Sequence, residues 1–253
     1  MAETMPLSNS IIVVAHPDDE VLWFGSLLRE IDRVVIVFQD YDADPALGIR
    51  RGKAIKELPF AVTCLAIPEA GSWLLADWFR PKISPYGLAL RVTPLSKHVS
   101  SNYEKNFRSI RACLKRQLSS DMNVFTHNPW GEYGHEDHVQ VFRVIESLRA
   151  EIGFTLHVSG YYSARSRTLA AYYTDCETIS PICRSIDSRY AHGIAELYKR
   201  HGCWTWAEDW VWPQDECFIG PPVLRGEGNL SSHLPNFSFL YEVPSSGDAP
   251  RVN

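Results

Sequence analysis

The chain has 253 residues, of which 45% are hydrophobic, and its formal net charge at pH 7 is −5. This hydrophobic content fits a folded globular protein, and the acidic charge balance gives no support to general nucleic-acid binding. No apolar stretch reaches the ~18 residues that a membrane-spanning helix needs, so we expect no membrane span.

Six cysteines are spread along the chain, and none forms a Cys-x-x-Cys pair, which excludes zinc-ribbon and thioredoxin-like motifs. The first ten residues, MAETMPLSNS, show neither the basic start nor the apolar segment of a secretory signal. We therefore expect a cytoplasmic protein with reduced cysteines. A disulfide such as Cys176–Cys183 stays open as the alternative.

The first part of the chain alternates predicted strands with predicted helices. Apolar, β-branched runs predict strands over residues 10–16, 33–39 and 61–67. Apolar residues at helical spacing predict helices over 18–31 and 48–58. This alternation indicates a parallel sheet with right-handed crossovers.

The rest of the chain continues this pattern less regularly. Helices are predicted over 103–118, 135–152 and 187–202, and strands over 123–128 and 154–163. Residues 71–102 mix aromatics, prolines and glycines, and we expect an irregular loop there on the substrate side. Residues 203–212 hold four of the eight tryptophans. These side chains could stack on a sugar or lipid, form a homo-oligomer contact, or pack in the core.

From these elements we expect an α/β fold, a Rossmann-like three-layer sandwich with a mostly parallel central sheet. A single domain over residues 1–253 is predicted, because no linker or internal repeat marks a boundary. Residues 10–160 form its core, and residues 161–223 complete the fold and the substrate side. Residues 224–253 are rich in Gly, Ser, Pro and Asn and are expected to form a loose tail.

Two polar clusters follow predicted strands. AHPDDE (15–20) ends the first strand, and THNPWGEYGHEDHVQVF (126–142) follows the strand over 123–128. The carboxyl ends of parallel strands meet at one edge of a sheet, so the two clusters should meet there. The chemistry-bearing residues of the second cluster are His127, Glu132, Tyr133, His135, Glu136, Asp137 and His138.

The spacing within these clusters predicts a metal site at that edge. His16 and Asp19 are three apart, so a helical turn places both on one face, and His138 of the other cluster could supply a third ligand. Two histidines and one carboxylate with an open position are typical of catalytic zinc. Asp18 is then free to act as a base. Each residue alone has a common structural explanation, since acidic residues in a first helical turn usually only balance the helix dipole.

Two other function classes lose their main support. No Gly-x-Gly-x-x-Gly follows the first strand, which disfavours dinucleotide binding, and no His-Glu-x-x-His motif of zinc proteases occurs.

AHPDDE (15–20) and YGHEDHVQV (133–141) together resemble the LmbE-like/PIG-L zinc-dependent N-deacetylases. The resemblance covers residues 10–160, with a weaker match at ECF (216–218). It implies a zinc hydrolase that removes an N-acetyl group from an amino sugar or glycoconjugate through metal-activated water.

The resemblance also implies roles for individual residues. The implied metal ligands are His16, Asp19 and His138, with Zn²⁺ as the ion and Fe²⁺ as the alternative. Asp18 resembles the general base. His135 resembles the histidine that assists the oxyanion or protonates the leaving amine, and Asp137 resembles the carboxylate that orients it. Tyr133 resembles a tyrosine near the carbonyl oxygen. His127, His192 and His201 are expected to be structural.

The substrate is less well defined by the sequence. Nine basic and three acidic residues lie between Asp77 and Asp121, which would suit a phosphorylated or nucleotide-linked sugar, or simply a solvated helix face. The alternative enzyme is a zinc amidase that acts on a larger acyl or peptide-like amide. The alternative of another class is a non-catalytic, metal-stabilised carbohydrate-binding protein, which would need neither Asp18 nor His135.

Overall fold

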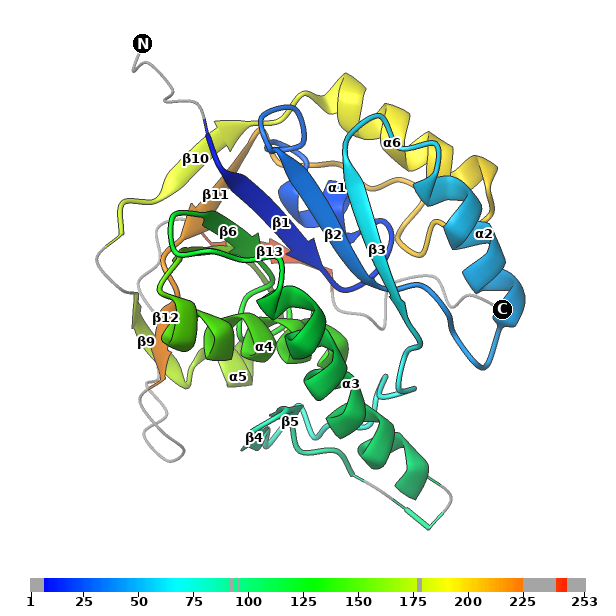
Figure 1. The fold of residues 1–253 in the computed structure, drawn as a ribbon, viewed down its shortest axis with the longest axis vertical. Coiled ribbons are helices and arrows are strands. Elements are labelled where there is room, and N and C mark those ends of the chain that lie inside the picture. The colour runs from blue at the N-terminus through cyan, green and yellow to red at the C-terminus, as the bar shows by residue number, and fades with distance from the viewer. Residues whose placement is uncertain (1–6, 92, 95, 177–178, 225–239, 245–253) are drawn as a thin grey trace.

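The computed structural model describes residues 7–91, 93–94, 96–176, 179–224 and 240–244. Its central sheet has seven strands in the order β10-β11-β7-β6-β1-β2-β3 (Figure 1). The strands are β1 (Ser10–Val14), β2 (Arg33–Phe38), β3 (Val62–Ile67), β6 (Asn123–Thr126), β7 (Thr155–Ser159), β10 (Ile182–Ser185) and β11 (Asp215–Ile219). The five strands from β7 to β3 are parallel, and β11 and β10 add an antiparallel edge. The predicted mostly parallel sheet is confirmed.

Helices cover both faces of this sheet. They are α1 (Asp19–Phe24), α2 (Pro45–Ile55), α3 (Lys97–Lys115), α4 (Glu136–Ile152), α5 (Arg167–Ala170) and α6 (Ser188–Arg200). Ile11 and Val13 of β1 pack with residues of α3 and α4, whereas Ile12 and Val14 pack with residues of α1 and α6. Successive side chains of a strand point to opposite faces, so β1 separates two hydrophobic cores. This arrangement is the predicted three-layer sandwich.

Short strands extend the structure beyond the central sheet. They are β4 (Ile83–Ser84), β5 (Gly87–Leu88), β8 (Tyr161–Ser163), β9 (Tyr173–Cys176), β12 (Pro222–Leu224) and β13 (Tyr241–Val243). The strand predicted over 154–163 divides at Gly160 into β7 and β8, and β8 pairs with β13. Thus part of the expected tail is a paired strand, and residues 225–239 and 245–253 lie outside the described residues.

Two predicted helix boundaries are wrong, each for an identifiable reason. The helix predicted over 18–31 ends at Phe24, where the Leu27 N–H bonds to the Phe24 carbonyl three residues back and tightens the chain into turns. The helix predicted from residue 103 begins at Lys97 as α3, because its buried face extends back to Val99. Among the residues described, no helix is both long enough and apolar enough to cross a membrane.

The basic residues of α3 belong to a solvated helix face. Arg108 pairs with Glu104, and both Arg111 and Lys115 pair with Glu151 of α4. The opposite face of α3, with Ile110, is buried in the core. These three cations thus pair with two neighbouring carboxylates, which favours the solvated-face interpretation over a binding site for an anionic sugar.

The expectation of reduced cysteines is wrong for one pair. Cys183 of β10 lies directly opposite Cys217 of β11 in the antiparallel register, and the two form a disulfide. Antiparallel pairing brings opposed side chains within bonding reach, a proximity that sequence spacing alone does not reveal. Since disulfides persist mainly in oxidising compartments, this bond gives no support to the expected cytoplasmic location.

Removing this disulfide should lower stability. The bond closes a loop with a sequence separation of 34 residues, and a loop of that length corresponds to about 3–4 kcal/mol of unfolding free energy. We expect the double variant Cys183→Ser/Cys217→Ser to unfold at a lower urea concentration than the parent protein. Cys113→Ser, at a free cysteine, is the control and should unfold like the parent. Equal midpoints for all three proteins would contradict the assignment.

The strand order explains where a site can form. From β1 the chain continues to β2 and β3 on one side, and later crosses to β6 and β7 on the other side. Connections that leave neighbouring parallel strands in opposite directions open a crevice at the carboxyl ends of those strands. Val13 of β1 pairs with Thr126 of β6, so the segments that begin at His16 and His127 start side by side.

Candidate metal centre

Three side chains from the two clusters converge at this edge of the sheet. Asp19 Oδ2 lies 3.3 Å from His16 Nδ1 and 3.3 Å from His138 Nε2. All three residues are buried, and one ligand atom from each lies within 4.8 Å of the others. They come from the end of β1 and the first turns of α1 and α4. The predicted meeting of the clusters is therefore present, and their metal-binding role remains a prediction.

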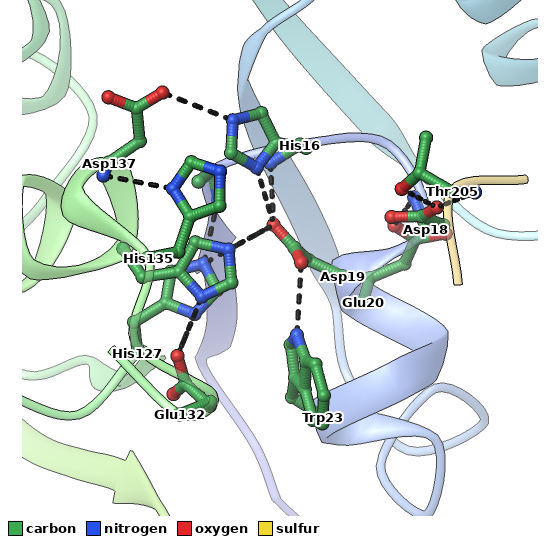
Figure 2. A network of polar contacts seen from close by, with 12 residues as sticks. His16, Asp18, Asp19, Glu20, Trp23, His127, Glu132, His135, Asp137 and Thr205 are labelled. Atoms are coloured by element: carbon green, nitrogen blue, oxygen red, sulfur yellow. Dashed lines mark hydrogen bonds and ion pairs between the residues drawn. The ribbon is translucent and has the colours of Figure 1, made fainter. Parts of the chain in front are cut away.

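Two donors close to Asp19 in sequence orient its carboxylate. Its Oδ2 accepts a hydrogen bond from the His16 backbone N–H at 2.7 Å, and its Oδ1 accepts one from Trp23 Nε1 at 2.9 Å (Figure 2). Trp23 is four residues on, which places it on the same side of α1. The sequence His-Pro-Asp-Asp-Glu-Val-Leu-Trp thus both supplies a candidate oxygen ligand and orients it.

Each of the two histidines has a carboxylate on its other ring nitrogen. Glu132 Oε2 lies 2.7 Å from His138 Nδ1, and Asp137 Oδ2 lies 3.3 Å from His16 Nε2. Carboxylates placed behind histidine in this way fix the tautomer and the ring orientation at metal sites. Among the described residues, His138 Nε2 has no hydrogen-bond partner although it is buried. An inward-facing nitrogen that lies beside the Asp19 carboxylate without a hydrogen bond to it fits a metal ligand.

The surroundings favour positive charge between these rings. Burial lowers the pKa of His16, but Glu69, Asp137 and Asp19 outweigh burial and raise it to about 10. Burial likewise lowers the pKa of His138, but Asp19 and Glu132 raise it to about 9. Two imidazoles and one carboxylate suit Zn²⁺, and the same set with open positions also suits Fe²⁺. The residues present therefore fit the implied ion.

Glu132 organises the second cluster, a role that sequence reasoning missed. Its Oε2 contacts Nδ1 of both His127 and His138, and its Oε1 accepts from the Asn128 N–H at 2.9 Å and from Ser159 Oγ. Burial raises the pKa of Glu132, but the two histidines outweigh burial and lower it to about 2. The carboxylate is therefore ionised and accepts hydrogen bonds from both rings.

The turn that carries Glu132 depends on Gly131. Gly131 has a φ of 66°, in the left-handed region, and a Cβ there would lie 2.6 Å from the His135 carbonyl oxygen. Only glycine fits this turn without displacing the backbone that leads into α4. The Trp-Gly-Glu sequence is therefore the local signal that could have marked Glu132 as a residue held in a special position.

His127, which was expected to be structural, has partners at both ring nitrogens. Its Nε2 accepts the Ala15 backbone N–H at 2.9 Å, and its Nδ1 lies 3.0 Å from Glu132 Oε2. Both ring nitrogens are thus engaged. The ring stacks on His138 with centroids 3.8 Å apart, so His127 ties β1 to the second cluster and supports one side of the site.

Glu132→Gln should weaken metal binding without removing a ligand. The amide keeps the shape of the side chain but loses the negative charge behind His138, and such changes typically cost about 10–100-fold in metal affinity. Competition with a chelator measures this affinity directly. Glu104→Gln, on the solvated face of α3, is the matched control. Unchanged affinity in Glu132→Gln would show that this carboxylate does not support a ligand.

His135 and Asp137 lie beside the three converging residues, in an arrangement that differs from expectation. The Asp137 backbone N–H, not its carboxylate, binds His135, donating to Nδ1 at 3.1 Å. The Asp137 carboxylate instead contacts His16 Nε2 and accepts a hydrogen bond from Ser72 Oγ at 2.7 Å. Burial and the nearby His16 hold the pKa of His135 well below its usual value. A neutral ring that accepts at Nδ1 carries its proton on Nε2.

Aromatic rings surround Tyr133 and His135. Tyr133 lies edge-on to His138, with centroids 5.3 Å apart, and packs against Trp206 at 4.8 Å. Trp73 stacks on His135 at 4.5 Å. The irregular segment 71–102 and the tryptophan-rich segment 203–212 therefore each place an indole next to the site.

Asp18 lies on the other side of Asp19 from the histidines. Figure 2 shows it beside Thr205, whose backbone N–H and Oγ1 donate to Asp18 Oδ2 at 2.9 and 2.7 Å. Burial, with a contribution from Asp19, raises the pKa of Asp18 to about 7. Sequence reasoning did not connect Arg51 with Glu69, with which it pairs at 2.5 Å. Glu69 Oε1 in turn lies 3.8 Å from His16 Nε2.

Comparison with known proteins supplies fold relatives. No family model and no curated protein matches the chain. Among solved structures, it is similar to a teicoplanin deacetylase in its zinc-inhibited form, at 15% identity over 87% of this chain and 100% of that chain, with a TM-score of 0.52. It is also similar to a deacetylase of the teicoplanin biosynthesis pathway in complex with bog, at 14% identity over 87% and 100% of the two chains, with a TM-score of 0.50. At these identities the likeness establishes the α/β fold.

Proposed function

We propose that this chain is a metal-dependent hydrolase that removes the N-acetyl group from an N-acetylated amino sugar or glycoconjugate. Its metal ligands would be His16, Asp19 and His138. The catalytic residues would be Asp18, Tyr133, His135 and Asp137. The expected ion is Zn²⁺, with Fe²⁺ as the alternative.

One observation carries the proposal. His16 Nδ1 and His138 Nε2 both lie 3.3 Å from Asp19 Oδ2, while a carboxylate contacts the far nitrogen of each ring. A metal-stabilised carbohydrate-binding protein could share these ligands and supporting carboxylates, but it would need neither Asp18 nor His135. The deacetylase named among the fold relatives supports amide hydrolysis as the reaction.

A bound Zn²⁺ or Fe²⁺ would polarise an amide carbonyl and lower the pKa of a water molecule. The chain itself must then move protons. Asp18 and Glu20 both adjoin the ligand Asp19 in sequence, and the oxygens of Glu20 are occupied by Tyr198 and by the Asp18 N–H, so we assign to Asp18 the proton that the attacking water loses. Because amide cleavage releases an amine, the leaving nitrogen must gain a proton. Either Asp18 returns the proton that it took from the water, or His135 gives one after it has itself been protonated.

His135 and Tyr133 suit the stabilisation of an oxyanion. His135 accepts the Asp137 N–H at Nδ1, so its Nε2–H is the donor it offers. Burial, with the nearby carboxylates, raises the pKa of Tyr133 well above its ordinary value, so its phenol stays protonated at neutral pH. Donors held in place before the reaction are the usual means of stabilising charge on a carbonyl oxygen. Asp137 would act by holding His16 and, through its backbone, His135.

The proposed substrate class rests on the aromatic surroundings and on the fold relatives. Trp73, Tyr133 and Trp206 offer flat, apolar faces next to the converging ligands. Such faces can pack against the apolar side of a sugar ring or of an aglycone.

A substrate panel tests the proposal. Purified protein, prepared anaerobically and loaded separately with Zn²⁺ or Fe²⁺, is incubated with N-acetyl sugars in free, phosphorylated, nucleotide-linked and aryl-glycoside forms, and released amine is measured. We expect metal-dependent amine release from at least one N-acetyl sugar, with about one ion per chain. N-acyl sugars of increasing acyl length and N-acetyl peptides form a second panel.

The outcomes separate the candidate functions. Release from long acyl amides or peptides alone would favour the amidase alternative. Sugar binding without release from any substrate would favour the carbohydrate-binding alternative. Protein that binds no ion under these conditions would overturn the metal site itself.

A further inference from the structure

We infer that Thr205 is a positioning residue for Asp18. Through Thr205, the segment 203–212 would complete the reaction site from a part of the chain that is distant in sequence. This inference rests on the proposed function, because it concerns the residue to which that function assigns a proton. It follows from the contacts of Asp18, from its burial, and from the packing that fixes Thr205.

Thr205 makes two hydrogen bonds to one oxygen of Asp18. Its backbone N–H and its Oγ1 donate to Asp18 Oδ2 at 2.9 and 2.7 Å (Figure 2). Hydrogen bonds to an ionised acceptor are stronger than neutral ones, and two together fix the rotation of the carboxylate. Because both bonds go to Oδ2, the proton transfer assigned to Asp18 falls to Oδ1.

Asp18 needs such support because its position is unfavourable. Its backbone φ is 97°, in the left-handed region that residues other than glycine rarely adopt. The carboxylate of Asp19 follows directly, and like charges repel. Asp18 is only 1% exposed, so water cannot replace the Thr205 donors. Without the Thr205 donors, we expect the Asp18 carboxylate to rotate away from its present orientation.

Thr205 is itself fixed from both sides. Two residues before it, the Cys203 N–H donates to the Tyr198 carbonyl at the end of α6 at 3.0 Å. One residue after it, Trp206 packs edge-on against Trp23 at 5.2 Å and against Tyr133 at 4.8 Å. The indoles therefore anchor the segment to α1 and to the second cluster, and the anchored segment presents Thr205 to Asp18.

Asp18, the other partner in this contact, is also held by a residue of α6. Tyr198 Oη donates to Glu20 Oε1 at 2.6 Å, and Glu20 Oε2 accepts the Asp18 backbone N–H at 3.1 Å. Tyr198 thus holds both sides of the Thr205–Asp18 contact, one through its carbonyl and the other through its hydroxyl. The Thr205 donors therefore belong to a connected set of contacts that fixes Asp18 next to Asp19.

The test compares Thr205→Val with Thr205→Ser. Valine keeps the shape and the backbone N–H but loses the Oγ1 donor, whereas serine keeps the donor. With the best substrate of the panel, we expect valine to lower kcat about tenfold with KM within about twofold, and serine to stay near the parent protein. In an Asp18→Asn background, Thr205→Val should cause little further loss. Val211→Ala, an exposed position of the same segment, is the matched control.

Metal content, the unfolding midpoint and a crystal structure of Thr205→Val accompany the kinetics. The crystal structure should show the Asp18 carboxylate turned from its present orientation. Unchanged kcat, an unmoved carboxylate, failure of serine to restore kcat, or a loss confined to KM, metal content or stability would each overturn the inference. If the parent protein hydrolyses nothing, the proposed function fails, and the crystal structure still decides whether Thr205 positions Asp18.

Discussion

Replacing His138 by alanine is expected to remove the bound ion and to lower amine release about 10³-fold or more. His138 is one of three side chains that meet around Asp19 Oδ2, and its Nε2 has no hydrogen-bond partner among the described residues. Loss of metal assistance removes several kcal/mol of transition-state stabilisation, and each 1.36 kcal/mol corresponds to tenfold in rate. Metal analysis after dialysis and the amine-release assay measure the two effects.

The control for this change is His98→Ala, because His98 is an exposed histidine on α3. It should keep the ion and the activity. Circular dichroism of His138→Ala checks that the chain remains folded, since the residue it replaces is buried. A folded His138→Ala protein with a full complement of ion and parental turnover would exclude His138 as a ligand.

Asp18→Asn should separate metal binding from turnover. The amide has nearly the shape of the carboxylate, and its oxygen can still accept the Thr205 donors, but it cannot accept the proton of an attacking water at neutral pH. We expect the ion content to remain at about one per chain and kcat to fall about 10²–10⁴-fold. Both quantities are measured on the same preparation.

Asp209→Asn, at an exposed carboxylate, is the control for this variant and should retain parental kcat. If Asp18→Asn kept its turnover, the proton would have to go elsewhere, and His135 would become the main candidate. If Asp18→Asn lost its ion instead, Asp18 would belong to the metal ligands rather than to the proton-transfer machinery.

The sequence was sufficient to predict which residues meet at the candidate site. Neighbouring parallel strands end at one edge, and both polar clusters follow such strands directly, so His16, Asp19 and His138 could be brought together before the fold was known. The meeting of the clusters follows from strand patterns and the geometry of parallel sheets alone. The choice of His138 over His127 and His135 rested on the family resemblance.

The supporting residues could not be predicted in the same way. Glu132 stood in the quoted cluster, but only the turn at Gly131 shows that its carboxylate reaches both His127 and His138. Thr205 is separated from Asp18 by 187 positions, and no spacing rule connects them. The Cys183–Cys217 disulfide likewise depends on the register of two antiparallel strands. Contacts set by tertiary packing leave little trace in local patterns.

Anomalous diffraction from crystals of the Zn²⁺-loaded protein tests the central claim most directly. The account predicts one strong peak at the zinc edge, in contact with His16, Asp19 and His138 and with a position open to substrate. Loaded crystals that show no peak among these three side chains, or an ion held elsewhere while they keep their present contacts, would contradict it.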